Sequence, residues 1–73
     1  MPNITQVKSS HITHVGYDPA TRCLDVYFNS GTYRYFNVKE DVYSDLLKAE
    51  SVGRFVNRYV VNNYDCVKLP SAK

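Results

Sequence analysis

Apolar and polar residues alternate along the first half of the chain, which is the pattern of strands that bury one face. β-Branched and aromatic residues predict a strand from residue 10 to residue 17, and Asp18 followed by Pro19 predicts the turn after it. Residues 23–29 predict a second strand, since apolar residues occupy every second position: Leu24, Val26 and Phe28. The first half is therefore expected to form an antiparallel sheet.

A tight reversal is predicted at residues 29–32, because Gly31 can adopt the positive φ that a short hairpin requires. With Ser30 and Gly31 as its two loop residues, the hairpin sets the register of a third strand. That register places Phe28 opposite Tyr33, Val26 opposite Tyr35, Tyr27 opposite Arg34, and Asp25 opposite Phe36. One face of the hairpin then gathers apolar residues, and the other face presents Tyr27, Arg34 and Phe36.

The second half of the chain changes to helical spacing. Residues 37–50 predict a helix, and Asn37 with Glu40 three residues later could form a capping box at its start. Its apolar stripe would be Val42, Leu46 and Leu47. Either Val38 or Lys39 is the alternative first residue of this helix.

A second helix is predicted to begin at Ser51, a favoured N-cap residue. Its apolar residues recur at i, i+3, i+4 and i+7: Val52, Phe55, Val56 and Tyr59. The helix is expected to end at Asn62 and Asn63, because asparagine tolerates the left-handed conformation that closes a helix. Residues 64–69 then either add a short edge strand or wrap around the sheet.

The expected fold is α+β: a three-stranded antiparallel β-meander packed with two α-helices, with a possible C-terminal edge strand. One domain is expected over residues 8–69, between loose termini at 1–7 and 70–73. The hydrophobic fraction of 44% and the seven Tyr and three Phe predict a folded globule. A chain of 73 residues supports only a small core, so a homo-oligomer is expected.

The net charge of +2 is too small for a strongly basic stripe, which disfavours duplex DNA as a partner. A cytoplasmic protein is expected, because the sequence has neither an apolar signal-peptide region nor a membrane-length apolar run. Cys23 and Cys66 are expected to be reduced thiols. No metal or cofactor is predicted, since the Cys and His residues lack the short paired spacings of a zinc site.

Three stretches carry a combined motif: VKSSHITHVGYD, LDVYFNSGTYRYFNV with Gly-x-Tyr-x-Tyr, and LLKAESVGRFVN with Ala-x-Ser-x-Gly-x-Phe-x-Asn. In this order, from Val7 to about Tyr64, they resemble the KTSC domain. That small domain occurs at the C-terminus of some lysyl-tRNA synthetases and alone in bacterial and phage proteins. Lys39 departs from the family's usual proline, which concerns only the helix start. The resemblance implies a compact α+β module without catalysis, suspected of binding RNA because of its synthetase fusions.

The start of the second helix is the first candidate site. Unpaired N–H groups there attract anions, and Gly53 would let a ligand approach the backbone. Arg54 and Arg58 would add two cations, and Asn57 could bind a sugar or a base edge. The alternative is structural: Ser51 only caps the helix, Gly53 only avoids a clash, and both arginines are solvated.

Aromatic residues of the hairpin form the second candidate site, because exposed rings on a sheet can stack nucleobases. Tyr33 and Tyr35 share the apolar face and could equally be core residues with satisfied hydroxyls. Tyr27, Arg34 and Phe36 would form an aromatic and cationic patch if their face is open, or a subunit interface if it is closed.

Ser9 and Ser10 are a hydroxyl pair that could hydrogen-bond a phosphate, with Lys8 alongside, or could form a turn. No catalytic part is assigned to His11 or His14. The sequence shows neither a nucleophile elbow nor a cysteine with a recognisable base, so the chain is expected not to be an enzyme.

Three functions are ranked from these features. The first is binding of nucleotide phosphates, in one version by a phage-type homo-oligomer that sequesters a cyclic or modified nucleotide signal. The second is RNA binding, and the third is a protein-protein adaptor whose aromatics form an interface. A small ligand ranks above a polymer because a net charge of +2 gives only weak electrostatic attraction to the many phosphates of a nucleic acid chain.

Overall fold

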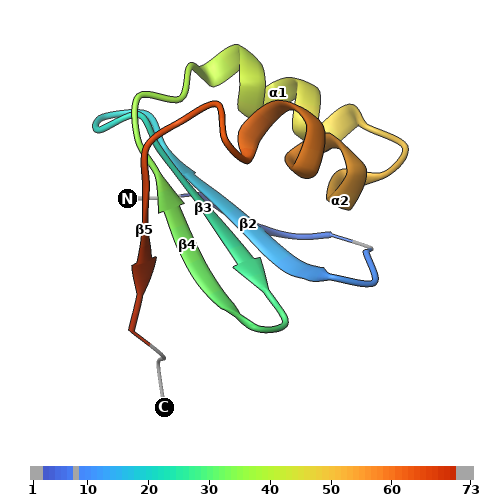
Figure 1. The fold of residues 1–73 in the computed structure, drawn as a ribbon. Coiled ribbons are helices and arrows are strands. Elements are labelled where there is room, and N and C mark those ends of the chain that lie inside the picture. The colour runs from blue at the N-terminus through green and yellow to red at the C-terminus, as the bar shows by residue number, and fades with distance from the viewer. Residues whose placement is uncertain (1–2, 8, 71–73) are drawn as a thin grey trace.

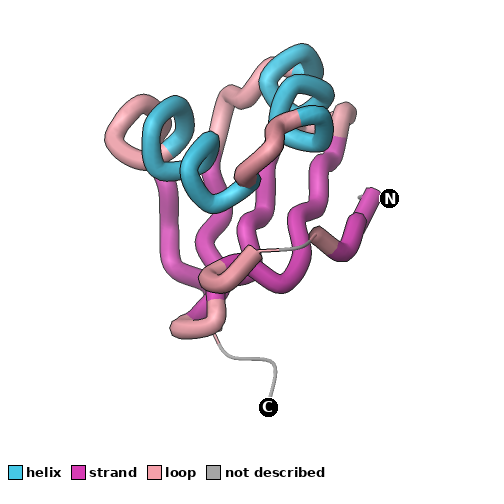
Figure 2. The backbone as a smooth tube through the Cα atoms, turned by 90° about the vertical axis from the view of Figure 1, so that its right-hand side faces the viewer, coloured by secondary structure: helices cyan, strands magenta, loops and turns pink. Residues whose placement is uncertain are grey.

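The computed structural model describes residues 3–7 and 9–70 of the chain. Five antiparallel strands form one sheet in the order β1-β2-β3-β4-β5, and the helices cover one of its faces (Figures 1 and 2). The strands are β1 (Asn3–Gln6), β2 (Ile12–Asp18), β3 (Cys23–Phe28), β4 (Gly31–Tyr35) and β5 (Cys66–Leu69). The helices are α1 (Glu40–Lys48) and α2 (Val52–Phe55), which continues directly into the π-helical η1 (Val56–Val60). The predicted α+β class is confirmed.

The sheet has two more strands than the predicted three-stranded meander. β5 is the edge strand that was one of the two alternatives for residues 64–69. The prediction of a loose N-terminus over residues 1–7 is wrong for residues 3–6, which pair along β2. Backbone hydrogen bonds hold such an edge strand, so it needs little apolar pattern of its own. Val7 is also held, because its N–H donates to the carbonyl of Thr13 at 3.1 Å, whereas residues 1–2 and 71–73 lie outside the described part of the chain.

The β3–β4 hairpin turns earlier than predicted, with Asn29 and Ser30 as its loop. Gly31 begins β4 with a φ of +150°, which side chains rarely allow. The observed pairs are Phe28 with Gly31, Tyr27 with Thr32, Val26 with Tyr33, and Asp25 with Arg34. The predicted register is therefore wrong by two residues. Phe36 lies beyond β4, where its N–H donates to the carbonyl of Asp65 at 2.9 Å instead of pairing with Asp25.

Helix α1 begins at Glu40 without the predicted capping box. Lys39 is its N-cap, and no side chain caps it. Asn37 has a left-handed φ of +58° and stands before the helix. Val38 is fully buried, and its N–H donates to the carbonyl of Arg22 at 2.9 Å. This tertiary anchor places the start of the helix, which explains why the local capping signal was misleading.

Ser51 caps α2 as predicted, since its Oγ accepts a hydrogen bond from the Arg54 N–H at 3.3 Å. The helix then changes to π geometry after Phe55. The Val61 N–H donates to the carbonyl of Val56 at 2.8 Å, which is the i to i+5 bond of a π-helix.

The buried stripe of the second helix is Val52, Val56 and Val60. Tyr59, which was predicted to lie in that stripe, is 53% exposed, and its ring packs against Phe55 with centroids 4.9 Å apart. Asn62 ends the helix with a left-handed φ of +71°, which confirms the predicted end. The Asn63 side-chain amide supports that end by donating to the carbonyl of Tyr59 at 2.9 Å.

The core lies between the helices and the covered face of the sheet. Its fully buried side chains are Ile12, Val15, Leu24, Val26, Val38, Leu46, Val56 and Val60. Tyr17 of β2 joins the layers, because its hydroxyl donates to the carbonyl of Val38 at 2.6 Å and its ring stacks on Tyr43 of α1. None of the helices described is long and apolar enough to cross a membrane.

Candidate functional site

A cleft of about 390 Å³ opens where the segment before β2, the β3–β4 turn and the second helix meet. Its lining residues are His11, Ile12, Phe28, Asn29, Ser30, Gly53 and Asn57. We call this hollow the loop-helix cleft. It brings two of the predicted site residues, Gly53 and Asn57, to the side of the hairpin turn.

Gly53 allows the segment before β2 to approach the second helix. A Cβ built at position 53 would lie 3.0 Å from the Ser9 hydroxyl oxygen, a contact tighter than most real Cβ contacts. The same oxygen accepts a hydrogen bond from the His11 N–H at 3.3 Å. Ser9 therefore lies beside Gly53, and its hydroxyl occupies part of the backbone approach that the sequence suggested for a ligand.

Removing the Ser9 hydroxyl should change the effect of the Gly53→Ala substitution on stability. Alanine is normally favoured over glycine in a helix by about 1 kcal/mol, but here its Cβ would press on Ser9. We expect Gly53→Ala to be about 1 kcal/mol more favourable in a Ser9→Ala background than in the wild type. Urea unfolding of the two single variants and the double variant measures this coupling. Additive effects would contradict the contact.

The Asn29 side chain fastens the hairpin turn to the segment before β2. Its Nδ2 donates to the carbonyl of Ser10 at 2.8 Å, and its backbone N–H donates to the carbonyl of His11 at 2.9 Å. Ser10 thus holds the lining residue Asn29 through its backbone carbonyl. Asn57, on the helical side, makes no hydrogen bond through its side chain within residues 3–7 and 9–70.

Arg54 and Arg58 are exposed and do not line the loop-helix cleft. They directly follow the lining residues Gly53 and Asn57 along the chain. The guanidinium carbon of Arg58 lies 6.0 Å from the ring centroid of Tyr59. Both cations therefore adjoin, along the chain, the two helical residues that line the cleft.

The hairpin tyrosines are not part of this cleft. Tyr35 is only 4% exposed and belongs to the core, and burial raises its pKa above the ordinary value. Tyr33 is half-buried on the same face, with its ring edge-on to Phe28 at a centroid distance of 5.8 Å. The core alternative is thus correct for Tyr35, whereas Tyr33 supports the ring of Phe28 in the cleft wall.

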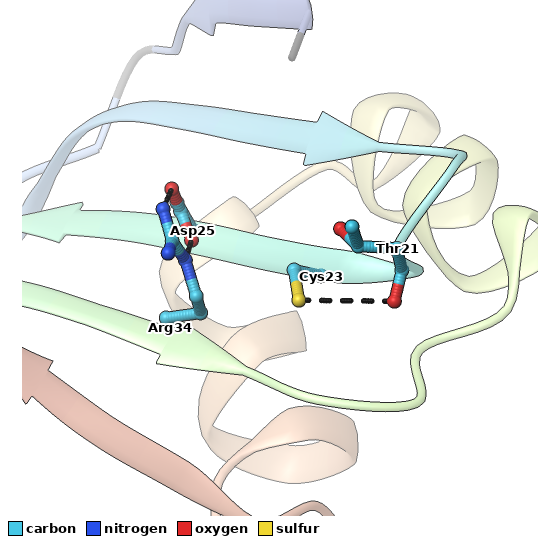
Figure 3. Close-up of polar contacts among 4 residues, drawn as sticks. All are labelled: Thr21, Cys23, Asp25 and Arg34. Carbon is cyan, nitrogen blue, oxygen red and sulfur yellow. Dashed lines mark hydrogen bonds and ion pairs between the residues drawn. The ribbon is translucent and has the colours of Figure 1, made fainter. Parts of the chain in front are cut away.

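Tyr27 and Arg34 alternate along their strands with the core residues Val26 and Tyr35, so they lie on the opposite face of the sheet. The helices leave that face uncovered (Figure 1). The Arg34 guanidinium is not free, because it forms a bidentate ion pair with Asp25 (Figure 3). Its Nε donates to Oδ1 at 2.9 Å, and its Nη2 donates to Oδ2 at 3.1 Å. The hydrogen bond and the negative charge of Asp25 raise the pKa of Arg34. The predicted aromatic and cationic patch therefore holds a neutralised cation, and Phe36 lies outside these strands.

The chemistry of the loop-helix cleft is that of hydrogen bonding and stacking. Its lining offers amides, a hydroxyl, one imidazole and one aromatic ring, but no carboxylate or thiol. Both cysteines are free, and Cys23 donates weakly to the carbonyl of Thr21 at 3.8 Å (Figure 3). Among the described residues, no cluster of three or more His, Cys, Asp or Glu side chains could hold a metal.

Four lining residues were not singled out as ligand residues from the sequence: Ile12, Phe28, Asn29 and Ser30. His11 was noted only as a residue without a catalytic part. No local signal could have identified them, because the turn reaches the helix only through tertiary packing. The Asn29-Ser30 pair indicated a turn and nothing about the partner of that turn.

The chain is similar to several known proteins. A family model described as the KTSC domain matches residues 8–64. A protein of Tsukamurella paurometabola is 48% identical over 64 residues, which cover 86% of this chain and 96% of that protein. An uncharacterized protein of Stutzerimonas stutzeri is 43% identical over 53 residues, which cover 71% of this chain and 75% of that protein.

A solved structure agrees with the fold as well. The crystal structure of a KTSC domain protein from Yersinia pestis matches with a TM-score of 0.92 and 34% identity, covering 96% of this chain and 100% of that one. The family match spans most of the chain and includes residues of all three motif stretches that meet at the loop-helix cleft. The chain therefore belongs to the KTSC domain family.

Proposed function

We propose that this chain is a non-enzymatic module that binds a small nucleotide in the loop-helix cleft. The observation that carries the proposal is the meeting of Phe28, Asn29 and Asn57 in one hollow, with an exposed arginine next along the chain after each of the two helical lining residues. An aromatic ring and amides suit a base and a sugar, and guanidinium groups suit phosphate oxygens.

The size and charge of the site favour a mononucleotide or dinucleotide over a polymer. A volume of about 390 Å³ lies within the range of small-molecule sites. The net charge is only +2, and Arg34 is already paired to Asp25, so few unpaired cations remain to contact a long phosphate backbone. Arg54 and Arg58 suffice for the one or two phosphates of a small ligand.

Calorimetric titration with a panel of linear and cyclic nucleotides tests this function. We expect at least one nucleotide to bind, and the double variant Arg54→Ala/Arg58→Ala to weaken its affinity roughly tenfold or more, because charge-assisted hydrogen bonds are lost. The matched control is Lys39→Ala/Lys48→Ala, which removes the same charge at the two ends of α1. This control should change the affinity less than about threefold, because long-range charge effects are screened by salt.

Single-stranded RNA is the second candidate ligand. It is favoured by the uncovered sheet face, where the rings of Tyr27 and His14 lie edge to face with centroids 5.9 Å apart. Stacking of bases on such rings needs no deep cleft. Absence of heat with every nucleotide, together with RNA binding that Tyr27→Ala abolishes, would replace the first proposal with this one.

A further inference from the structure

One row of residues crosses the uncovered face of the sheet from β1 to β5. In the strand register, Ile4 pairs with Gly16, Gly16 with Asp25, Asp25 with Arg34, and Arg34 with Val67. Residues that pair across neighbouring strands share one face, so the row is continuous over the whole sheet. The helices lie on the other face (Figure 1). We call these residues the transverse row.

The transverse row carries its features in a fixed order. Ile4 and Val67, at its ends, are large apolar side chains that stay 56% and 47% exposed. Gly16 is the low point of the row, because it has no side chain and its backbone is buried. Asp25 and Arg34 supply one charge of each sign at neighbouring positions. A partner that presents the complementary order of charges and shapes fits such a surface.

Arg34 can donate to a second carboxylate besides that of Asp25. Its Nε and Nη2 groups donate to Asp25, whereas Nη1 donates to no atom of residues 3–7 and 9–70. The Arg34 side chain also remains 42% exposed, compared with 11% for the Asp25 side chain. A guanidinium donates from several N–H groups, and each carboxylate oxygen accepts more than one hydrogen bond. The pair can therefore bind a second pair that faces it in the opposite order.

A second copy of this chain presents that opposite order when a two-fold axis runs parallel to the strands, above the space between β3 and β4. The rotation brings β3 opposite β4 of the partner, so Asp25 faces the partner's Arg34 and Arg34 faces the partner's Asp25. It also brings β5 opposite β2 of the partner, which places Val67 over the partner's Gly16. Every contact then occurs twice, as the isologous interface of a dimer requires.

The charges disfavour the other simple two-fold arrangements of facing sheets. An axis above β3 would place Asp25 against the partner's Asp25. An axis perpendicular to the strands, above the row, would place every residue against its own copy, Arg34 included. Like charges that face each other across an interface are strongly unfavourable. The neighbouring row of side chains also suits the first axis, because Tyr27 then faces the partner's Thr32.

We infer that the uncovered face of the sheet is the interface of a homodimer related by this axis. The two sheets then form a sandwich with aligned strands. Five strands about 4.8 Å apart and about 17 Å long give roughly 400 Å² of flat area per copy, so a weak, concentration-dependent dimer is expected. The transverse row contains no lining residue of the loop-helix cleft, so the inference stands apart from the proposed nucleotide function.

Sedimentation equilibrium of the whole chain between about 10 μM and about 1 mM measures the dimer. Val67→Glu should raise the dissociation constant roughly tenfold or more, because it would bury an unpaired charge over the partner's Gly16. The matched control is Leu47→Glu, which introduces the same charge at an apolar residue of α1 that is 42% exposed. This control should change the dissociation constant less than about threefold, because distant charges are screened by salt.

Gly16→Val distinguishes the face of the sheet from its edges, because β2 is an inner strand. The new side chain would fill the low point under Val67, so the dissociation constant should again rise roughly tenfold or more. Gly16 lacks the positive φ of Gly31, and β-branched residues suit strands, so the variant should fold, as circular dichroism checks. If it does not fold, Thr32→Glu on the inner strand β4 takes its place.

Each result of this experiment has a definite reading. A weaker dimer in both face variants, with the Leu47→Glu dimer unchanged, supports the inference. A monomer at every concentration would overturn it. A dimer that neither face variant weakens, or that Leu47→Glu weakens equally, would place the contact elsewhere and overturn the inference as well. A dimer that only one face variant weakens would also overturn it, since the axis brings both positions into one contact.

Discussion

Replacing Leu46 with alanine is expected to destabilise the domain by about 2–5 kcal/mol. Leu46 lies on the inner side of α1 with 0% exposure, so truncation leaves a cavity between the helix and the sheet. Stabilities of about 0.05–0.15 kcal/mol per residue are typical, so a chain of 73 residues loses a large share of its total. Urea unfolding followed by circular dichroism measures the loss as a shift of the midpoint.

Leu47 provides the matched control for this experiment. It is the next residue of the same helix and undergoes the same chemical change, but its side chain is 42% exposed. Leu47→Ala should therefore cost less than about 1 kcal/mol, since little apolar surface is lost from the core. Equal losses at the two positions would show that α1 does not pack with the face described.

Replacing Tyr17 with phenylalanine is expected to cost about 1–3 kcal/mol near neutral pH. The Tyr17 hydroxyl donates a 2.6 Å hydrogen bond to the Val38 carbonyl, and its removal leaves that buried acceptor without this donor. The stacking of ring 17 on Tyr43 should survive the change. Urea unfolding at neutral pH measures the loss, and Tyr59→Phe, at an exposed tyrosine, should have almost no effect.

The cost of Tyr17→Phe should shrink in alkaline solution. Burial, followed by the negative charge of Glu40, raises the pKa of Tyr17 above the ordinary 10.0, although Arg22 partly opposes this. Because the folded state holds the proton more tightly, the contribution of Tyr17 is complete below about pH 10 and is lost as the pH rises through the raised pKa. Phenylalanine does not titrate, so only the wild type loses stability at this position.

Unfolding curves at about pH 7 and about pH 11 give the free energy of unfolding of the wild type and of Tyr17→Phe. The difference between the two proteins should be smaller at the higher pH. The buried Tyr35, whose pKa is also raised, is present in both and cancels to first order. A difference that is the same at both pH values would contradict the buried, hydrogen-bonded state of Tyr17.

The hairpin shows how far a local pattern can specify a sheet. The faces of β3 and β4 were predicted correctly, because side chains alternate with a period of two and the apolar residues must share one face. The register was wrong by two residues, and a shift of two preserves that alternation. The positive φ of Gly31 was anticipated, but its place at the start of β4 depends on how the loop of Asn29 and Ser30 attaches to the segment before β2.

In the helices, too, some features could be predicted from the local sequence and others could not. Ser51 as a cap and Asn62 as an end were predictable, because each acts on backbone groups within a few residues of itself. The capping box at Asn37 failed, since the buried Val38 and its bond to the Arg22 carbonyl hold the chain there. The π geometry of η1 and the exposure of Tyr59 likewise had no local signal.

For the candidate site, the sequence alone predicted candidate ligand residues, among them the Ser9-Ser10 pair, Gly53 and Asn57. Only the tertiary structure decided that Gly53 and Asn57 meet Phe28 and Asn29 in one cleft, with Ser9 against Gly53, while Tyr35 enters the core and Arg34 is neutralised by Asp25. The physical reason is the distance along the chain over which each kind of interaction acts. Periodicity and capping act over a few neighbouring residues, whereas the cleft arises from contacts between a strand entry, a turn and a helix far apart in the chain.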